Sequence, residues 1–378
     1  MRIRGSTLFV LALLGLLHFY IGWRILPVLP IAVGWKALGA AWLAASWFLI
    51  PASMMAHSVA NREKADRLSW AGMLALGLFS SLFVSTLLRD ILLAALGILG
   101  LYSADAVLWS AVAAPALAGM ATLIGFFNAR RVARVVQVDV PIAGLPPELD
   151  GFTIAQISDI HIGPTIKRGY LDAIVDRVNA LKPDVVAVTG DLVDGSVRHL
   201  APHTAPLARL QGRHGAYFVT GNHEYYSNAH AWIEEVRRLG LKVLMNEHVV
   251  LPHDGASLLL AGVTDYTAHH FDPTHRSDPH AAIAGAPGDV GVKVLLAHQP
   301  RTSAAAADAG FDLQLSGHTH GGQFFPWNFF VPMQQPYVAG LKRLRNMWVY
   351  VSRGTGYWGP PKRFGAPSEI TWVRLTRA

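Results

Sequence analysis

The sequence predicts an N-terminal α-helical transmembrane bundle followed by an α/β domain made of layered sheets and helices. Three observations support this division. Leu, Ala, Gly, Trp and Phe dominate residues 6–128, which include only four acidic residues. Charged residues return from about residue 140, together with fifteen of the seventeen histidines. From residue 152, short apolar runs alternate with helical patterns. We therefore expect a membrane domain over residues 1–130, a linker over 131–150 and a soluble domain over 151–378.

Four apolar runs are long enough to cross a bilayer, since a spanning helix needs about 20 apolar residues. They cover residues 7–26, 37–55, 70–88 and 106–128. The shorter segment 91–102 either extends the third span or lies at the membrane interface. Arg2 and Arg4 precede the first run as in a signal peptide, but the run is too long and three more follow it. The scarcity of acidic residues argues against buried core helices.

Lys and Arg in the short connections predict the orientation of the spans. One side has Arg2, Arg4, Arg62, Lys64, Arg67, Arg130, Arg131 and Arg134, and the other has Arg24, Lys36 and Arg89. This bias predicts a multi-pass protein of an inner or plasma membrane, with both termini and the soluble domain in the cytoplasm. A transport path usually needs ionisable groups inside the membrane. The candidates all lie near predicted span ends, and they are His18, His57, Arg89 and Asp90. Anchoring is therefore the favoured role of the spans.

The overall charge and the lack of cysteine exclude some classes of protein and site. The formal net charge is +7, which can indicate nucleic-acid binding. Here many basic residues lie at the ends of apolar runs, where they meet lipid headgroups, so we expect no nucleic-acid partner. The chain has no cysteine, which excludes disulfides and thiolate metal sites.

The soluble domain shows strand runs separated by helical patterns. The runs are FTIAQIS, PDVVAVTG, AYFVTG, SLLLAGV, VKVLLAH and FDLQLSG. Helix-face spacing predicts helices over residues 171–181 and 229–239. The last two runs, MWVYVS and EITWVRL, have no clear helix between them, so we expect them to form an antiparallel pair.

Five of these runs end in polar residues that can bind a metal ion. The residues are Asp159 and His161 after FTIAQIS, Asp191 after VVAVTG, Asn222, His223 and Glu224 after AYFVTG, His298 after VKVLLA, and His318 and His320 after FDLQLSG. Each cluster alone is common by chance. Open α/β sheets bind ligands beyond the carboxyl ends of their strands, so five such ends in chain order predict one functional site.

In chain order these clusters read D-x-H, G-D, G-N-H-E, H and G-H-T-H. The set resembles the motifs of the calcineurin-like metallophosphoesterase superfamily. The closing stretch SRGTGYWGPPKRFGAPSEI resembles a membrane-associated subgroup of that superfamily with N-terminal spans. The resemblance covers residues 152–375 and implies a layered α/β/β/α sandwich.

The resemblance also implies a site for two divalent metal ions. One ion would be held by Asp159, His161, Asp191 and His320, and the other by Asp191, Asn222, His298 and His318. Asp191 would bridge the two ions and is therefore expected to be catalytic. Carboxylate, amide oxygen and imidazole donors suit Mn, Zn or Fe. Ions bound there would activate water for attack on a phosphate ester and neutralise the phosphoryl oxygens.

Two further groups are expected near this site. His223 follows Asn222 directly, so it can face the site without binding a metal. We expect it to act as a general acid, or as an electrostatic stabiliser where the leaving group is good. Asp265, at the end of the run SLLLAGV, is a candidate supporting residue.

The segment HHFDPTHRSDPH, residues 269–280, has a composition typical of metal binding. Its Pro, Asp and Ser are equally typical of a surface loop. We expect a surface loop, with a third metal site as the alternative.

An aromatic loop follows the last expected ligand, with Phe324, Phe325, Trp327, Phe329 and Phe330. It either packs into the core or forms an exposed lip beside the metal site, as contiguous apolar patches do at contact sites. In the second case Phe324, Phe325 and Trp327 bind the apolar part of a lipid phosphoester. The basic residues that would then meet anionic headgroups are Arg343, Arg345, Arg353, Lys362 and Arg363.

The predicted function is a membrane-anchored, metal-dependent hydrolase of phosphate esters, with phosphodiesters favoured and lipid-linked esters included. Its expected partners are the lipid bilayer and the ester substrate. Two other classes remain as alternatives. One is a metal-bound regulatory protein without turnover, and the other is a transporter with an accessory soluble domain.

Overall fold

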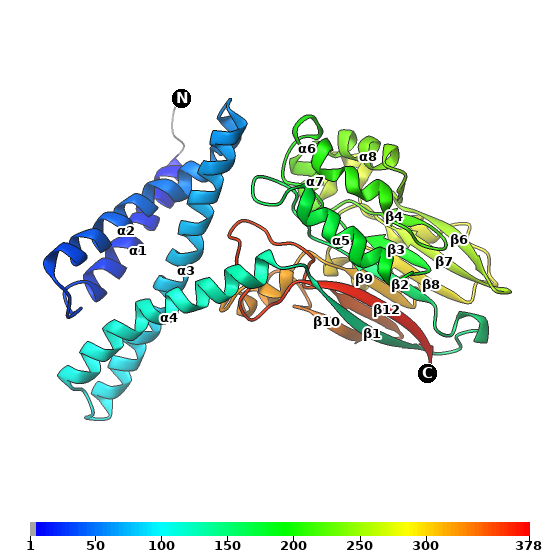
Figure 1. Ribbon diagram of the computed structural model, residues 1–378. Coiled ribbons are helices and arrows are strands. Elements are labelled where there is room, and N and C mark those ends of the chain that lie inside the picture. Colours follow the sequence, from blue (N-terminus) through cyan, green and yellow to red (C-terminus); the bar gives the residue numbers. More distant parts are fainter. Residues whose placement is uncertain (1–4) are drawn as a thin grey trace. The chain divides into compact units, whose positions relative to one another are not determined.

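The computed structural model describes residues 5–378, which form two compact units (Figure 1). The helical unit contains the chain up to Asn128 together with Gly359–Phe364. The α/β unit contains Ala129–Trp358 and Gly365–Ala378. Arg2 and Arg4, used above to orient the first span, lie outside the described residues.

The helical unit has four long apolar helices, as the sequence predicts. They are α1 (Gly5–Ile25), α2 (Val33–Met54), α3 (Arg62–Ile98) and α4 (Ala104–Arg130). All four are long and apolar enough to cross a membrane by length and composition. The segment 91–102 does not form a separate element at its start, because α3 continues through Arg89 and Asp90 to Ile98.

Small residues and paired polar groups hold these helices together. A Cβ added at Gly72 of α3 would lie 2.5 Å from the carbonyl oxygen of Leu49 in α2. Membrane helices approach closely at such small residues. Asp90 of α3 accepts hydrogen bonds from Arg24 at 2.8 Å and from Tyr20 at 2.7 Å, both in α1. Arg24, Tyr20 and Asp90 are therefore used in contacts between helices.

The short segment Gly359–Phe364 belongs to the helical unit although it is close to the C-terminus. Nζ of Lys362 donates to the carbonyl oxygen of Gly77 at 2.9 Å and to Oγ1 of Thr122 at 3.3 Å. Lys362 and Arg363 are both buried. The expectation that they meet lipid headgroups is therefore wrong, because their side chains are enclosed by protein.

The α/β unit contains two six-stranded sheets (Figure 1). The first has the order β1-β12-β2-β3-β4-β5, and the second has the order β10-β11-β9-β8-β7-β6. The strands of the first are β1 (Arg134–Ile142), β2 (Thr153–Ile157), β3 (Val185–Val188), β4 (Ala216–Phe218), β5 (Lys242–Val243) and β12 (Glu369–Arg377). Those of the second are β6 (Glu247–His253), β7 (Ala256–Gly262), β8 (Val292–Leu296), β9 (Leu313–Ser316), β10 (Gly340–Leu344) and β11 (Met347–Val351).

The sheets and helices form the expected four layers. One core lies between the sheets and joins Ile154 and Val185 of the first sheet to Leu258 and Leu296 of the second. The helices packed on the first sheet include α5 (Arg168–Ala180), α6 (Val197–Thr204) and α8 (Ala229–Arg238). Those packed on the second are α9 (Pro279–Ile283) and α10 (Ser303–Asp308). Burial of apolar side chains in these three cores is the main stabilising contribution.

Two details differ from the expectations for this unit. The predicted linker 131–150 contains β1, which pairs in parallel with β12 over Arg134–Ile142. The runs MWVYVS and EITWVRL do not pair with each other, because β11 joins β9 and β10 while β12 joins β1 and β2. Both errors have one cause: local patterns do not show which sheet a strand enters.

Candidate metal centre and active site

The expected ligands all follow the carboxyl ends of parallel strands. Strands β2, β3 and β4 run parallel in the first sheet, and β8 and β9 run parallel in the second. Asp159 follows β2, Asp191 follows β3, and Asn222 begins the short helix α7 (Asn222–Tyr226) after β4. His298 follows β8 and His318 follows β9. The topology therefore brings residues more than 150 positions apart to one edge of the domain.

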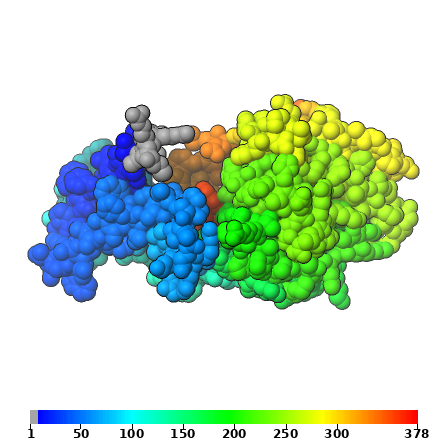
Figure 2. All heavy atoms as spheres, turned by 90° about the horizontal axis from the view of Figure 1, so that it is seen from above, coloured from blue at the N-terminus to red at the C-terminus, as the bar shows by residue number. Residues whose placement is uncertain are grey.

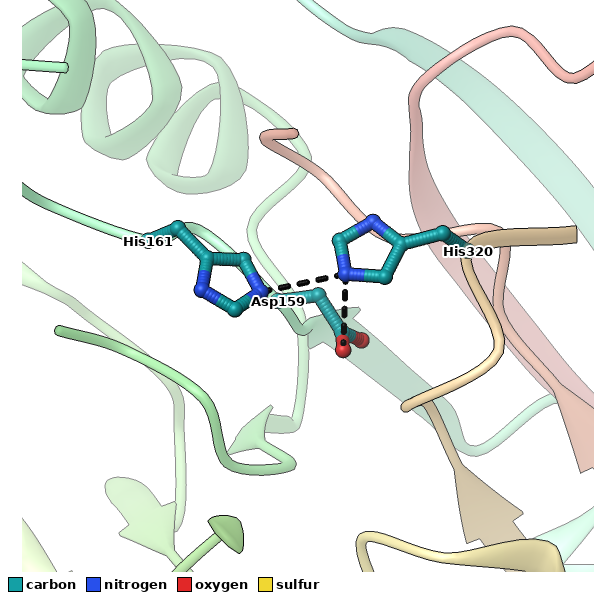
Figure 3. A group of neighbouring side chains, drawn as sticks. All are labelled: Asp159, His161 and His320. Atoms are coloured by element: carbon teal, nitrogen blue, oxygen red, sulfur yellow. Dashed lines mark hydrogen bonds and ion pairs between the residues drawn. The ribbon is translucent and has the colours of Figure 1, made fainter. Parts of the chain in front are cut away.

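The first ligand group contains Asp159, His161 and His320 (Figure 3). Nε2 of His161 lies 3.0 Å from Nε2 of His320. Nε2 of His320 lies 3.5 Å from a carboxylate oxygen of Asp159. All three residues are buried, and their donor atoms lie within 4.8 Å of one another. This spacing suits one metal ion at the centre of the group.

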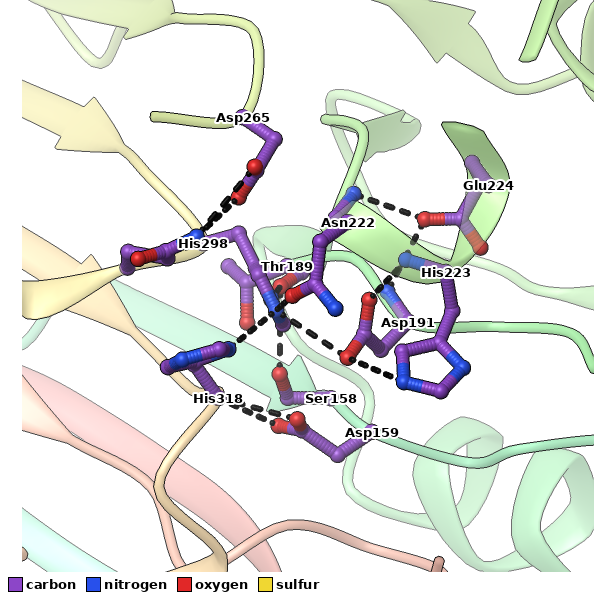
Figure 4. A network of polar contacts seen from close by, with 12 residues as sticks. Ser158, Asp159, Thr189, Asp191, Asn222, His223, Glu224, Asp265, His298 and His318 are labelled. Carbon is purple, nitrogen blue, oxygen red and sulfur yellow. Dashed lines mark hydrogen bonds and ion pairs between the residues drawn. The ribbon is translucent and has the colours of Figure 1, made fainter. Parts of the chain in front are cut away.

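The second ligand group contains Asp191, His298 and His318, with Asn222 beside them (Figure 4). Nε2 of His298 lies 3.2 Å from Oδ2 of Asp191 and 3.2 Å from Oδ1 of Asn222. Nδ1 of His318 lies 3.2 Å from Nε2 of His298. The same Oδ2 of Asp191 is 3.9 Å from Nε2 of His161 in the first group. Asp191 therefore lies between the two groups, where a bridging carboxylate is needed.

The backbone of the site is strained. Asp159, His161, Asp191, His318 and His320 all have positive φ, between 51° and 71°. Residues other than glycine rarely adopt this conformation, and such strain is concentrated at functional sites. Five of the seven expected ligands share it, so the loops are shaped to aim these side chains.

Hydrogen bonds also fix the imidazole rings. Nδ1 of His298 donates to the carbonyl oxygen of Thr189 at 2.8 Å. Nδ1 of His161 lies 3.0 Å from Oδ1 of Asp194. In both rings Nε2 is the nitrogen that faces the ligand groups. Partners of this kind orient the histidine ligands of metal sites.

The charges of the site fit a bound cation. Asp159 and Asp191 are buried, and a buried carboxylate is costly unless it is paired or binds a metal. Burial alone would lower the pKa of His298, but the charge of Asp191 and their hydrogen bond raise it well above its usual value. Burial and the charge of His298 lower the pKa of His318 to about 3, so this ring is a neutral donor. The donor set, of oxygen and imidazole nitrogen, suits a transition metal such as Mn, Zn or Fe.

His223 lies beside both ligand groups without belonging to either. Its Nε2 is 4.0 Å from Oδ2 of Asp191 (Figure 4). Its Nδ1 is 2.6 Å from Oδ1 of Asp194. Burial opposes its protonation, but the hydrogen bond to Asp194 and the charge of Asp191 raise the pKa of His223 to about 9. A protonated imidazole thus faces the position between the ligand groups.

Comparison with known proteins agrees with this geometry. The family model described as calcineurin-like phosphoesterase matches residues 152–322. An uncharacterized metallophosphoesterase of Aquifex aeolicus is 32% identical over 224 residues, which cover 59% of this chain and 84% of that protein. The chain belongs to the calcineurin-like phosphoesterase family. Its motif residues therefore lie in the family's metal-binding fold.

Two further relatives of this chain have names that include a transmembrane protein. Both are named transmembrane protein with metallophosphoesterase domain. The one from Bos taurus is 41% identical over 279 residues, which cover 70% of this chain and 63% of that protein. The one from Danio rerio is 40% identical over 262 residues, covering 67% and 60%. The chain thus spans less than two thirds of the length of these relatives.

The structure gives two acidic residues, Asp194 and Glu224, contacts at the site that the sequence analysis did not assign to them. Asp194 contacts His161 and His223, as described above. Glu224 is buried, and its carboxylate accepts hydrogen bonds from the backbone N–H groups of Gly221 at 2.6 Å, Leu192 at 2.8 Å and Asp191 at 3.0 Å. It ties the turn before α7 to the turn after β3. Asp194 is three residues after Asp191 in GDLVD, and Glu224 is the last residue of the quoted motif G-N-H-E, so the available signal was their position in or beside the motifs.

Asp265 is a supporting residue in the structure. Its carboxylate accepts from the side-chain amide of Gln299 at 3.0 and 3.2 Å and from the backbone N–H of Thr267 at 2.8 Å (Figure 4). Gln299 follows the ligand His298 directly. Asp265 therefore lies beside the site and contacts the residue that follows His298.

The aromatic loop divides into one buried ring and several exposed rings. Phe324 is buried, whereas Phe325, Trp327 and Phe329 are 45%, 42% and 67% exposed. Core packing thus accounts for Phe324 alone among these four. Two further exposed rings, of Tyr226 and Trp358, lie 5.1 and 5.7 Å from the ring of His223. The expected basic residue Arg353 pairs with Glu369 at 3.0 Å.

Proposed function

We propose that this chain is a membrane-anchored, metal-dependent hydrolase of phosphate esters. The observation that carries the proposal is the position of Asp191 between two groups of metal-binding side chains. Oδ2 of Asp191 is 3.9 Å from His161 in one group and 3.2 Å from His298 in the other. Two divalent metal ions held by these groups would supply an activated water and neutralise charge on the phosphoryl oxygens.

His223 completes the chemistry from the protein side. Its Nδ1 is held by Asp194 at 2.6 Å, so the ring presents Nε2 to the space beside Asp191. From there Nε2 donates a proton to the leaving oxygen of the ester as its bond to phosphorus breaks. Asp194 keeps the ring in this orientation. The product alcohol and phosphate then leave without a charged alkoxide having formed.

We further propose a phosphodiester substrate with an apolar substituent. The exposed rings of Tyr226 and Trp358 lie beside His223, on the side where the leaving group must be. A diester carries a second substituent that such uncharged rings can contact. The exposed rings of the aromatic loop, Phe325, Trp327 and Phe329, offer more apolar surface of the kind enriched at membrane interfaces. A lipid-linked ester meets both requirements.

The test is turnover by the full-length protein in detergent, stripped of metal and reloaded with Mn, Zn, Fe or Mg. The substrates are an aryl phosphodiester, an aryl monoester and a panel of phospholipids, with Asp191→Ala as the control. Metal-dependent hydrolysis that disappears in Asp191→Ala supports the proposal. Hydrolysis that persists in Asp191→Ala overturns the site assignment. Stoichiometric metal binding without turnover of any ester would favour a regulatory role.

We also propose that the α/β unit faces the cytoplasm. The basic residues Arg62, Lys64 and Arg67 begin α3, and Arg130 ends α4, on the same predicted side. The positive-inside rule puts that side in the cytoplasm. Labelling of single cysteines introduced into the cysteine-free chain tests this in intact cells. A cysteine at Ser196, in the α/β unit, should react only after the cells are permeabilised.

A further inference from the structure

Another group of side chains that could hold a metal ion lies outside the two ligand groups described above. It contains His230 of α8 with Asp272 and His275 of the segment between β7 and α9. We call these three residues the outer cluster. Figure 2 shows the surface on which α8 and the segment after β7, coloured yellow-green and yellow, adjoin each other. Nothing in the dinuclear site or its reaction uses these side chains.

The donor atoms of the outer cluster converge at the spacing of a zinc site. Nε2 of His230 lies 3.0 Å from Oδ2 of Asp272, and Nε2 of His275 lies 3.9 Å from the same oxygen. All three donor atoms lie within 4.8 Å of one another. Two donors of a tetrahedral zinc ion are about 3.4 Å apart, given bond lengths of about 2.0–2.1 Å. The two measured distances lie on either side of that value.

Hydrogen bonds to neighbouring groups leave Nε2 of His275 and Oδ2 of Asp272 facing the outer cluster, where they can bind a metal ion. Nδ1 of His275 lies 2.9 Å from the hydroxyl of Tyr225, so its Nε2 is the atom that faces Asp272. Oδ1 of Asp272 accepts from the backbone N–H and the hydroxyl of Thr274 at 2.9 and 2.6 Å, so Oδ2 is left for the cluster. Outer partners of this kind orient the ligands of metal sites.

The outer cluster also has space for a further ligand. His230 and His275 also line an open pocket of about 300 Å³, which leaves room for a water molecule as a fourth ligand. Three protein ligands and one open position are typical of solvent-accessible zinc sites.

We propose that His230, Asp272 and His275 form a third metal site, which binds zinc with water in the remaining position. Bound zinc would join α8 to the segment after β7. By fixing His275, it would also fix the hydroxyl of Tyr225, which contacts Nδ1 of His275. Tyr225 belongs to helix α7, which begins with Asn222 and His223. The third ion would thus stabilise the side of the active site that carries His223. The proposal does not depend on the reaction proposed above.

The test is zinc stoichiometry and affinity of the full-length protein in detergent, measured by titration calorimetry after metal removal. The wild type should bind three zinc ions per chain. His230→Ala should bind two, and because the side chain of His230 is 66% exposed, the fold should survive this change. His280→Ala, which changes an exposed histidine of α9 outside the outer cluster, is the matched control and should bind three.

Two further measurements separate the third site from the dinuclear one. The double variant Asp191→Ala/His230→Ala should bind one zinc ion fewer than Asp191→Ala, whatever happens to the dinuclear site. Tyr225→Phe should weaken binding of the third ion about 10- to 100-fold, because the partner of His275 is removed. Equal zinc binding by the wild type and His230→Ala would overturn the proposal.

Discussion

Oδ1 of Asp194 lies 2.6 Å from Nδ1 of His223 and 3.0 Å from Nδ1 of His161. One carboxylate thus orients both the proposed general acid and a ligand of the first metal group. Burial opposes the ionisation of Asp194, but the charges of His161 and His223 and their hydrogen bonds lower its pKa to about 2. Because the carboxylate is ionised at any working pH, it can stabilise positive charge on His223.

Replacing Asp194 with Asn should slow the proposed hydrolysis in a way that depends on the leaving group. The amide keeps the shape of the side chain but not its charge, so proton donation by His223 weakens. We expect kcat to fall about 100-fold for an alkyl phosphodiester, within the usual range for general acid catalysis. For a nitrophenyl diester, whose leaving group needs little help from a proton, the loss should be below about tenfold.

Metal content is the control for the Asp194→Asn variant. If Asp194 acted mainly by positioning His161, the variant would lose metal, and kcat would fall equally for both esters. Elemental analysis of the purified protein should instead show an unchanged metal content. Equal losses of kcat on both esters would show that the contact with His223 is not the important one.

Glu224 offers a test of how the site is held in place. Glu224→Ala leaves three buried backbone N–H groups without their acceptor, and each such loss costs about 1–3 kcal/mol. We expect the melting temperature of the α/β unit to fall by at least about 5 °C. Glu234→Ala, an exposed glutamate of α8, should change it by less than about 2 °C. Similar melting of the two variants would contradict the structural role given to Glu224.

Removing the metal ions should also destabilise the α/β unit. Asp159 and Asp191 are both buried, and burial together with the charge of Asp191 raises the pKa of Asp159. A ligand bound only by the folded state stabilises it by about 2.7 kcal/mol at 100 times its Kd. Chelator should therefore lower the melting temperature of the wild type by several degrees, measured by differential scanning fluorimetry. The effect should be smaller in Asp191→Ala, and a wild type indifferent to chelator would argue against bound metal.

The sequence predicted which side chains lie together at this edge, because each of them belongs to a short local motif. Asp159, Asp191 and His298 directly follow strand runs, and the parallel order of the strands brings such positions to one edge. Asp194 was missed because its role depends on where its side chain points. The same holds for Lys362, which the sequence placed at the lipid surface and the structure places inside the helical unit. Local sequence patterns do not predict contacts between segments that are far apart in the chain.

Close packing of α2 against α3 can be tested at Gly72. A Cβ at this position would lie 2.2 Å from Cβ of Ser53 and 2.5 Å from the carbonyl oxygen of Leu49. Overpacking of this kind costs about 1–3 kcal/mol. Gly72→Ala should therefore speed trypsin cleavage at Arg62 and Lys64, at the start of α3. Gly119→Ala in α4, where a Cβ meets open space, should leave the cleavage rate unchanged.

Substitutions in the aromatic loop can test whether the substrate is a lipid-linked ester, because buried and exposed rings lie within four residues of each other. Trp327 and Phe325 are exposed and Phe324 is buried, so substitutions here should have two different effects. Removing an exposed ring that contacts lipid loses about 1.4 kcal/mol or more of apolar contact, which is about tenfold in rate. We expect Trp327→Ser and Phe325→Ser to slow hydrolysis of a phospholipid in vesicles about tenfold. Both variants should hydrolyse a soluble aryl diester within about twofold of the wild type.

Phe324→Ser supplies the contrast for that experiment. Its ring is 8% exposed and lies four residues after His320, so its loss should disturb the fold of the loop and the ligand together. Turnover of the soluble ester and of the lipid should then fall in parallel. If Trp327→Ser and Phe325→Ser also reduced both activities equally, the exposed rings would be part of the structure of the site. A lipid-selective loss, by contrast, requires that the rings contact the substrate or the membrane surface that presents it.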